Sequence, residues 1–130
     1  LNTLMQLSLA LIDLTYHGPS VPRDPSKAFA KTFSDTALIP LSPGTHPEGQ
    51  FGHIMDGYDA GYYGYLWSSV YAQDMFSIFK KYGLRDITIG RRYREEILEV
   101  GGSRPAAESF KAFRGREPSI DALLRHGGLA

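Results

Sequence analysis

The chain has 130 residues, of which 42% are hydrophobic and 22% are charged. This length suffices for one domain with a modest core, and the composition excludes an intrinsically disordered chain. Fourteen basic and fourteen acidic side chains cancel, so we expect no nucleic acid and no anionic membrane as partner. Cysteine is absent, which excludes disulfide bonds and thiolate chemistry and leaves the compartment open.

The N-terminal segment LNTLMQLSLALIDLTY predicts a buried helix. Its leucines recur at helical spacing, at Leu4, Leu7, Leu11 and Leu14, and so favour cover on most sides. The segment has no basic N-terminal region, and Asp13 interrupts the apolar run, so it is typical of neither a signal peptide nor a membrane span. Because the chain starts without Met inside this pattern, we expect a fragment of a longer protein.

The remaining chain predicts further helices separated by glycine and proline. These helices are expected at residues 26–38, 62–82, 86–98, 103–113 and 118–125. Asp86 and Ser103 are the expected N-caps of two of them, and Pro118 is expected in the first turn of the last. No sustained alternation indicates a strand, so we predict an all-α fold of five to six helices. Such short helices form either a self-sufficient small domain or a piece that packs on missing chain or on a second copy.

One segment, FGHIMDGYDAGYYGYLW, combines four tyrosines and a histidine with four glycines. It follows a proline-rich surface loop, so that residues 40–64 form one long loop of the kind that often carries function. If a helix begins at Tyr58, then Tyr58, Tyr62 and Tyr65 share one face, with Tyr63 and Trp67 on the opposite, buried side. If the glycines instead keep residues 52–61 as a loop, His53 and Tyr58 gain reach. Either geometry presents hydroxyls that can stabilise an oxyanion.

No complete catalytic motif accompanies these residues. The chain has no H-E-x-x-H zinc motif and no G-x-S-x-G nucleophile motif. His46 and Glu48 lie in a loop and are weak candidates for a metal site, so we predict no metal ligand in this chain. An independent enzyme that uses His53 with the tyrosines would need an orienting carboxylate, for which Asp56 and Asp59 are the candidates.

At FGHIMDGYDAGYYGYLW the chain resembles the C-terminal part of the thimet oligopeptidase and neurolysin family of zinc metallopeptidases, and it looks nearest to the saccharolysin-like fungal members. The resemblance continues through SSVYAQDMF, ILEVGGS and FRGREPSIDALLRHGGL. The opening LMQLSLALIDLTYHG is similar to the helix that follows the zinc-ligand region in those enzymes. The resemblance thus covers nearly the whole chain and implies the C-terminal part of a larger helical peptidase.

The resemblance also implies roles for individual residues. The histidine of the mobile loop corresponds to His53, which would steady the oxyanion, while Tyr58 and Tyr65 would contact the scissile carbonyl. Tyr62 would line the substrate channel. Loop closure over a short peptide would depend on the glycines, Gly57 and Gly61. The zinc of the full-length parent would be held by residues upstream of this chain.

Three positions depart from the family pattern, and two functional alternatives stay open. Asp56 stands where a glycine is common, Ser69 where a glutamate is frequent, and Arg114 where F-L-G-R has leucine. The first would change substrate handling, and the other two would affect packing. The chain is then either the C-terminal part of a zinc oligopeptidase, which supplies substrate-binding and transition-state-stabilising residues and is inactive alone, or a noncatalytic helical module that binds partners or self-associates. The family implies a cytoplasmic or, alternatively, a mitochondrial location.

Overall fold

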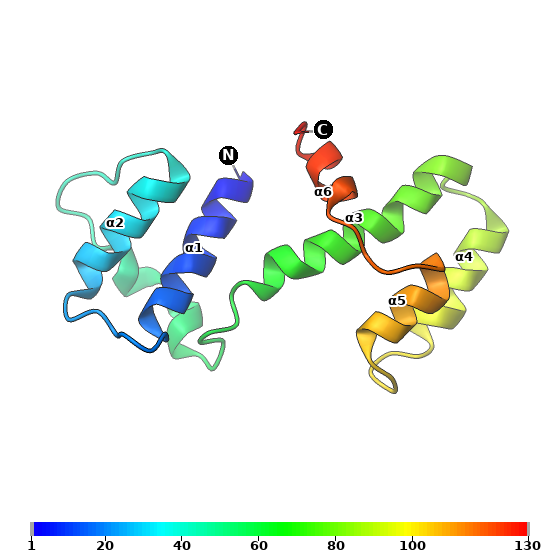
Figure 1. The fold of residues 1–130 in the computed structure, drawn as a ribbon, viewed down its shortest axis with the longest axis horizontal. Helices are drawn as coiled ribbons and strands as arrows, with labels where there is room; N and C mark the ends of the chain where they lie inside the picture. Colours follow the sequence, from blue (N-terminus) through cyan, green and yellow to red (C-terminus); the bar gives the residue numbers. More distant parts are fainter. Residues whose placement is uncertain (1, 130) are drawn as a thin grey trace. The chain divides into compact units, whose positions relative to one another are not determined.

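The computed structural model describes residues 2–129, and within this range the chain contains six α-helices and no strand (Figure 1). The predicted all-α fold is therefore confirmed. The chain divides into two compact units, Leu1–Trp67 and Ser68–Ala130. Each unit is described by itself.

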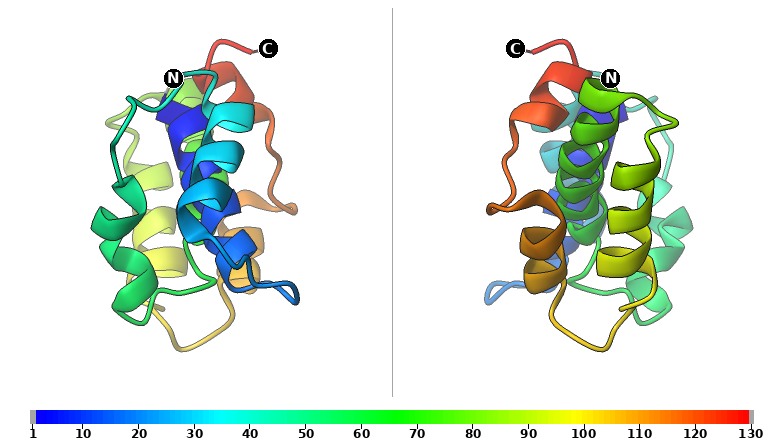
Figure 2. Two further views of the ribbon diagram at one scale, coloured as in Figure 1. Left: turned by 90° about the vertical axis from the view of Figure 1, so that its left-hand side faces the viewer. Right: turned by 90° about the vertical axis from the view of Figure 1, so that its right-hand side faces the viewer.

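The first unit is built on an antiparallel pair of helices, α1 (Asn2–Tyr16) and α2 (Pro25–Ala37), which lie side by side in Figures 1 and 2. Asp24 caps α2, because its carboxylate accepts the Lys27 N–H at 3.0 Å, and a proline occupies the first helical position. Leu38 ends α2 in the left-handed conformation, at φ 60°. The core between the helices and the following loop contains buried Ala10, Ile12, Phe29, Phe33, Ala37, Phe51 and Tyr62.

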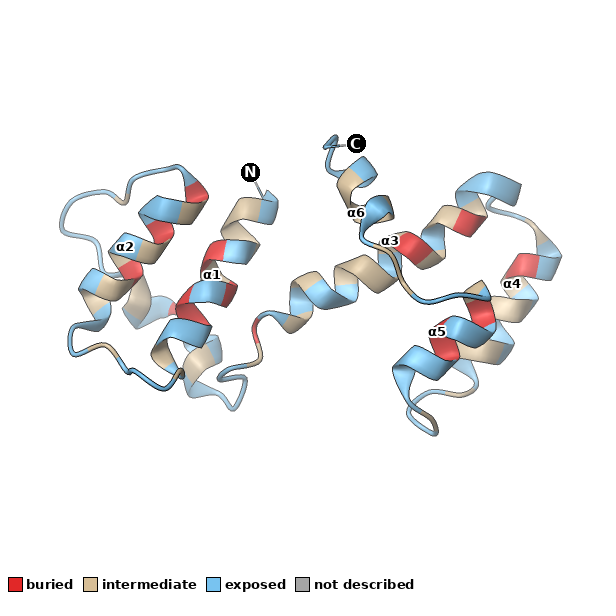
Figure 3. Cartoon of the chain, in the orientation of Figure 1, coloured by how far each residue is buried: buried red, intermediate tan, exposed pale blue. Residues whose placement is uncertain are grey.

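Helix α1 buries only part of its apolar surface. Ile12 is fully buried, but Leu7, Leu11 and Leu14 are 38–44% exposed. The buried positions, red in Figure 3, thus lie on a different side of the helix from the leucine stripe. The stripe that predicted a buried helix is therefore only half covered within this unit.

The loop between α2 and α3 is less irregular than its composition predicts. It contains two 3₁₀ turns, η1 (Pro47–Gln50) and η2 (Gly52–Met55). Glu48 joins the loop to α2, because the Ser26 hydroxyl donates to its carboxylate at 2.5 Å, and the His46 imidazole lies 3.0 Å from the same oxygen. The Ser26 hydrogen bond, a backbone hydrogen bond of Glu48 itself and His46 lower the pKa of this carboxyl.

The second unit holds most of the remaining helices. Helix α3 (Gly64–Tyr82) begins in the first unit and supplies residues 68–82 to the second, which also contains α4 (Ile87–Tyr93), α5 (Ala106–Arg114) and α6 (Asp121–His126). A single π-helical segment, η3 (Arg94–Leu98), continues α4 and packs on α5. Asp86 caps α4 as predicted, accepting the Ile89 N–H at 2.9 Å. The core of this unit contains buried Ile78, Ile89 and Phe113.

Three local predictions are wrong. Ser103 does not cap α5, which begins three residues later after Pro105, because a residue that precedes proline disfavours helical dihedrals and interrupts the predicted helix. Pro118 does not open α6, which begins at Asp121. Tyr63 and Trp67 are 51% and 61% exposed rather than buried. The exposure of Tyr63 and Trp67 follows from the start of α3 at Gly64 rather than at Tyr58, since the face that they were expected to share does not form.

A buried ion-pair cluster explains why the chain before α6 is not helical. Asp74 on α3 is 1% exposed, and both amino nitrogens of Arg116 donate to its carboxylate at 2.6–2.7 Å. Arg114 donates to it through Nε at 3.1 Å, and the backbone N–H of Ser119 donates at 2.7 Å. Residues 114–119 are therefore held against α3 by one carboxylate.

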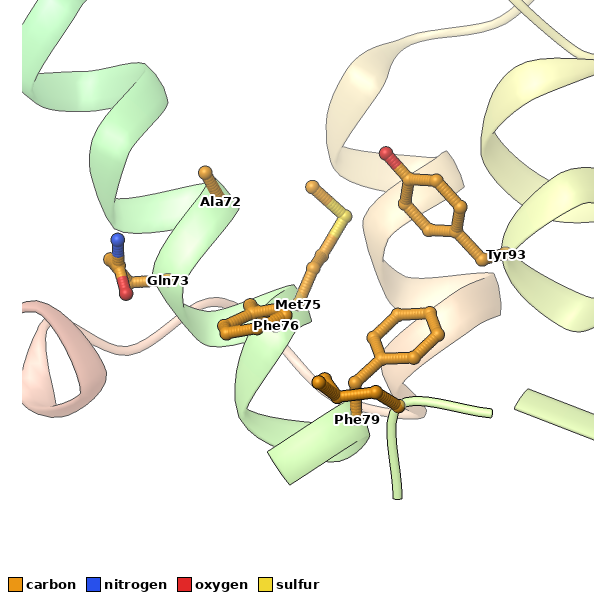
Figure 4. A pocket seen from close by; sticks show the side chains of 7 residues that line it. Ala72, Gln73, Met75, Phe76, Phe79 and Tyr93 are labelled. Atoms are coloured by element: carbon orange, nitrogen blue, oxygen red, sulfur yellow. The ribbon is translucent and has the colours of Figure 1, made fainter. Parts of the chain in front are cut away.

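A shallow apolar hollow of about 470 Å³ opens on the second unit (Figure 4). The side chains around it come from α3, from the turn after it and from α4, and they include Met75, Phe76, Phe79, Leu84 and Tyr93. Phe76 is 42% exposed and Leu84 69% exposed. This face thus keeps large apolar side chains in contact with water.

Candidate functional site

Five aromatic rings gather where the glycine-rich loop meets the first turn of α3. This aromatic cluster consists of Phe51, His53, Tyr58, Tyr62 and Tyr65. The His53 ring lies 5.0–6.2 Å, between centroids, from each of the other four rings. Its Nε2 is 3.3 Å from the Tyr65 hydroxyl oxygen, and the tautomer of His53 decides which group donates. Residues that are twelve apart in the sequence are thus brought into direct polar contact.

The cluster has a buried base and an exposed rim. Phe51 and Tyr62 are 7% and 6% exposed and meet edge to face, with centroids 5.1 Å apart. Tyr58 and Tyr65 are 42% and 44% exposed, and their rings are 5.5 Å apart. His53 is exposed as well. The three residues that the resemblance implies as catalytic therefore share one surface, supported by a packed aromatic base.

The loop alternative of the sequence analysis is the one adopted. Helix α3 begins at Gly64 rather than at Tyr58, and residues 56–63 form turns. Gly57 has φ +74°, where a side chain is strained. At Gly61 a Cβ would lie 3.2 Å from the Tyr58 carbonyl oxygen, so this turn has no room for a larger residue without a shift. Backbone geometry thus favours glycine at both positions.

Asp13 contacts this turn from α1. Its side chain is fully buried, and its two carboxylate oxygens accept the N–H groups of Ala60 and Tyr62, each at 2.9 Å. The His17 Nδ1 lies 2.9 Å from one of the same oxygens and 2.9 Å from the Asp13 carbonyl oxygen. From the sequence, Asp13 was expected only to interrupt the apolar helix. A carboxylate on a buried helix face signals that it needs partners, but it does not indicate which distant segment supplies them.

Two hollows of the first unit meet at His53. One is lined by apolar side chains of α1, α2 and the loop, together with Tyr62, and has a volume of about 350 Å³. The other, of about 490 Å³, is lined by Gln50, Gly52, His53, Asp56 and Tyr58. The cluster thus borders an apolar surface on one side and a polar surface on the other, which is an arrangement suited to an amphipathic ligand.

The tyrosine hydroxyls can serve as hydrogen-bond donors. Burial raises the pKa of the Tyr62 phenol, Tyr65 raises it further, and a hydrogen bond with the Gln6 side chain offsets part of this effect. Phenols ordinarily lose their proton only near pH 10, so Tyr62 stays neutral at physiological pH. The hydroxyls of the exposed rim, at Tyr58 and Tyr65, are placed to donate to a carbonyl oxygen that gains negative charge.

A metal site would need several ligand side chains close together. Among residues 2–129, no group of three or more His, Asp or Glu side chains lies close enough together to hold a metal ion. His46 and Glu48, the weak candidates from sequence, contact each other and Ser26. The described residues thus offer no zinc ligand set, and no chemical step is assigned to a metal bound by them.

Comparison with known proteins identifies the family. The sequence profile of peptidase family M3 matches residues 1–129. This chain belongs to peptidase family M3. The family consists of zinc metallopeptidases, so the resemblance noted from sequence is confirmed.

Individual members of the family show how much of such a protein this chain covers. It is 38% identical to the thimet-like oligopeptidase of Dictyostelium discoideum over 97% of its length. It is 40% identical to oligopeptidase A of Salmonella typhimurium over 97% of its length, and 41% identical to saccharolysin of Saccharomyces cerevisiae over 99%. In each case it spans only 19% of the relative. The chain thus corresponds to a fragment of an M3 peptidase.

Proposed function

We propose that this chain supplies the substrate-binding and transition-state-stabilising residues of a zinc oligopeptidase that hydrolyses short peptides. The observation that carries the proposal is the aromatic cluster, in which the exposed His53, Tyr58 and Tyr65 share one surface and His53 Nε2 lies 3.3 Å from the Tyr65 hydroxyl. The names of the M3 relatives, which include oligopeptidases, support peptides as the substrate class.

Each residue of the cluster would have a distinct part in this function. Tyr58 and Tyr65 would donate hydrogen bonds to the scissile carbonyl as it becomes an oxyanion, and His53 would bind the substrate and donate alongside them. Tyr62, which lines the apolar hollow with His53, would support the substrate channel. Gly57 and Gly61 would allow the loop to close over the peptide.

The remaining parts of the reaction would lie upstream of this chain in the longer protein. Zinc, when bound there, supplies water activation, and an upstream glutamate would act as general base. The 130-residue chain alone would therefore not hydrolyse peptides. Chelator-sensitive turnover of a short fluorogenic peptide by purified chain, free of other peptidases, would contradict this part of the proposal.

The role of the cluster is tested in the longer protein that contains this chain. We expect Tyr65→Phe to lower kcat for a quenched fluorescent peptide by about 10²-fold with little change in KM, because the hydroxyl acts mainly in the transition state. Tyr58→Phe would have an effect in the same direction.

Tyr63→Phe provides a matched control. Tyr63 lies in the same turn and is 51% exposed, but it is not part of the aromatic cluster, so its variant should keep its kcat within about twofold of wild type. Equal effects of Tyr63→Phe and Tyr65→Phe would remove the basis of the proposal, since the loss could then not be assigned to the cluster.

A second candidate function is a noncatalytic helical module that docks on other chains or on a second copy. The exposed leucine stripe of α1 and the apolar hollow of the second unit favour it, since both leave large apolar side chains in water. Multi-angle light scattering of the chain distinguishes the two. A clean monomer at high concentration would exclude self-association. The upstream peptidase sequence would then be the segment expected to cover these apolar side chains.

For the location of the parent we propose the cytosol, with mitochondria as the alternative. The M3 relatives include a probable cytosolic oligopeptidase A and an organellar oligopeptidase A of Arabidopsis thaliana. Within residues 2–129, none of the helices has both the length and the apolar character needed to cross a membrane. Fractionation of cells with an antibody against this chain tests the assignment.

A further inference from the structure

The Asp13 carboxylate accepts hydrogen bonds that helix α1 itself does not need. Its two carboxylate oxygens do not cap α1, which runs on to Tyr16, but bind the backbone of a turn 47 and 49 residues away in sequence. The carboxylate is fully buried, and a buried charge is tolerated only when its hydrogen bonds are satisfied. The loop amides of Ala60 and Tyr62 thus provide much of what makes this burial possible.

The turn at residues 58–62 also needs support from outside itself. Ala60 has φ +55°, a left-handed conformation that costs an L-residue with a side chain free energy. The turn has one internal hydrogen bond across it, from the Gly61 N–H to the Tyr58 carbonyl at 3.1 Å. The Asp13 carboxylate accepts two charge-assisted hydrogen bonds here, from the N–H of Ala60 itself and from the N–H of Tyr62, and such bonds are about twice as strong as neutral ones.

The turn leads directly to the rings of the aromatic cluster. Tyr62, whose N–H is held by Asp13, packs its ring 5.0 Å from His53 and 4.9 Å from Tyr65. Its carbonyl accepts the Tyr65 N–H at 3.2 Å in the first turn of α3. Tyr58 is the first residue of the same turn, two residues before Ala60. Displacement of the turn would therefore move both rim tyrosines relative to His53.

We propose that Asp13 is a positioning residue: its buried carboxylate fixes the turn at residues 58–62 so that Tyr58 and Tyr65 stay beside His53. The catalytic part of this inference rests on the proposed function, whereas the structural part does not. Asp13 contacts no substrate and acts only through the backbone of the loop. His17 is the third donor to the carboxylate, and its side chain is 30% exposed.

Hydrogen exchange of the longer protein, followed by mass spectrometry of peptides covering residues 52–65, tests the structural part. In wild type, the Ala60 and Tyr62 amides should exchange at least tenfold more slowly than the amides at residues 56–58, because Asp13 gives the former two a buried acceptor. Equal exchange rates in wild type would overturn the proposal, and this measurement does not depend on any variant that must fold.

Asp13→Asn tests the same contact by perturbation. Asparagine keeps one acceptor oxygen and turns an NH₂ donor toward the other loop amide, so exchange of the turn should accelerate about tenfold or more. Asp74→Asn is the matched control, since Asp74 is also a buried carboxylate but lies in the second unit. It should leave exchange at residues 58–62 unchanged. Faster exchange in both variants, or in neither, would refute a specific tether.

Kinetics of the same variants test the catalytic part. Asp13→Asn should lower kcat for a short fluorescent peptide by about tenfold with a KM within threefold of wild type, whereas Asp74→Asn should leave both within twofold. An Asp13→Asn enzyme with faster exchange but unchanged kcat would refute the positioning role while the tether stands. A Tyr65→Phe enzyme with unchanged kcat would instead refute the proposed function, so the two failures are distinguishable.

Discussion

The buried carboxylate of Asp74 provides the sharpest test of what stabilises the second unit. Five nitrogen atoms, from Arg114, Arg116 and Ser119, lie within 3.1 Å of its oxygens, and the Arg114 side chain is only 12% exposed. Asp74→Asn keeps one acceptor oxygen but removes the negative charge, so the buried Arg114 guanidinium is left with neutral partners only, among them the Ser77 hydroxyl at 3.2 Å. Breaking a buried ion pair in this way costs about 3–5 kcal/mol.

The lower end of that range applies here. Arg116 is 46% exposed and can turn its charge toward water, so only Arg114 is left uncompensated. We therefore expect Asp74→Asn to lower the free energy of unfolding by about 3 kcal/mol at pH 7. With an m-value of about 1–3 kcal/mol/M, the midpoint of urea unfolding followed by circular dichroism would fall by roughly 1–3 M.

Acidification should reduce the difference in unfolding free energy between wild type and Asp74→Asn. Burial alone raises the pKa of Asp74, but the hydrogen bonds from Arg116, Ser119 and Arg114 and the charge of Arg116 outweigh it and hold the pKa below its ordinary value. A carboxyl whose pKa is lower in the folded state contributes stability above the unfolded pKa of about 3.9 and loses it as pH falls through the folded pKa. The cost of Asp74→Asn is thus full at pH 7 and shrinks in acid.

Two further variants make the reasoning refutable. Asp35→Asn removes a carboxylate that lies 2.6 Å from Lys31, but both side chains are more than 60% exposed, so its cost should be about 0.5 kcal/mol or less. Arg114→Leu, which restores the residue common in the family, should be less harmful in the Asp74→Asn background than in wild type. Equal effects of Arg114→Leu in both backgrounds, or equal costs of the two Asp variants, would refute the argument.

Two other predictions concern packing and helix termination, both measured by urea unfolding. Phe113→Ala should cost about 3–5 kcal/mol because Phe113 is fully buried, whereas Phe76→Ala, at a residue 42% exposed, should cost less than half as much; equal costs would contradict the described core. Leu38→Gly should stabilise the first unit by about 0.5–1 kcal/mol, because Leu38 ends α2 at φ 60° and is 75% exposed, and a loss of stability would contradict it.

Sequence predicted those features of the fold that depend on neighbouring residues. Asp86 caps α4 and Gly83 follows the end of α3, because caps and stops act over three or four residues. Ser103 was a wrong cap because Pro105 two residues later shifts the helix start. Pro118 was a wrong start because the Ser119 N–H donates to Asp74, which lies 45 residues earlier.

In the candidate site, too, the sequence predicted some features and missed those that depend on distant contacts. The exposed surface shared by His53, Tyr58 and Tyr65 was implied by the family resemblance, and the structure brings these residues together. The sequence left open whether a helix begins at Tyr58 or residues 52–61 form a loop, and the positive φ of Ala60 excludes the helix. Asp13 was missed as a partner of the loop because its contacts join segments 47 residues apart, and a single sequence carries no signal for such a pairing.

The two ends of the glycine-rich loop also limit how far it can travel. Phe51 is buried at one end, and Asp13 holds the turn at residues 58–62 at the other, so residues 52–57 are the span left between anchors. Fully extended, this span measures roughly 21 Å, so its tip can rise no more than about 10 Å above its attachments. This reach is an upper limit on how far any closing movement could carry the loop toward a bound peptide.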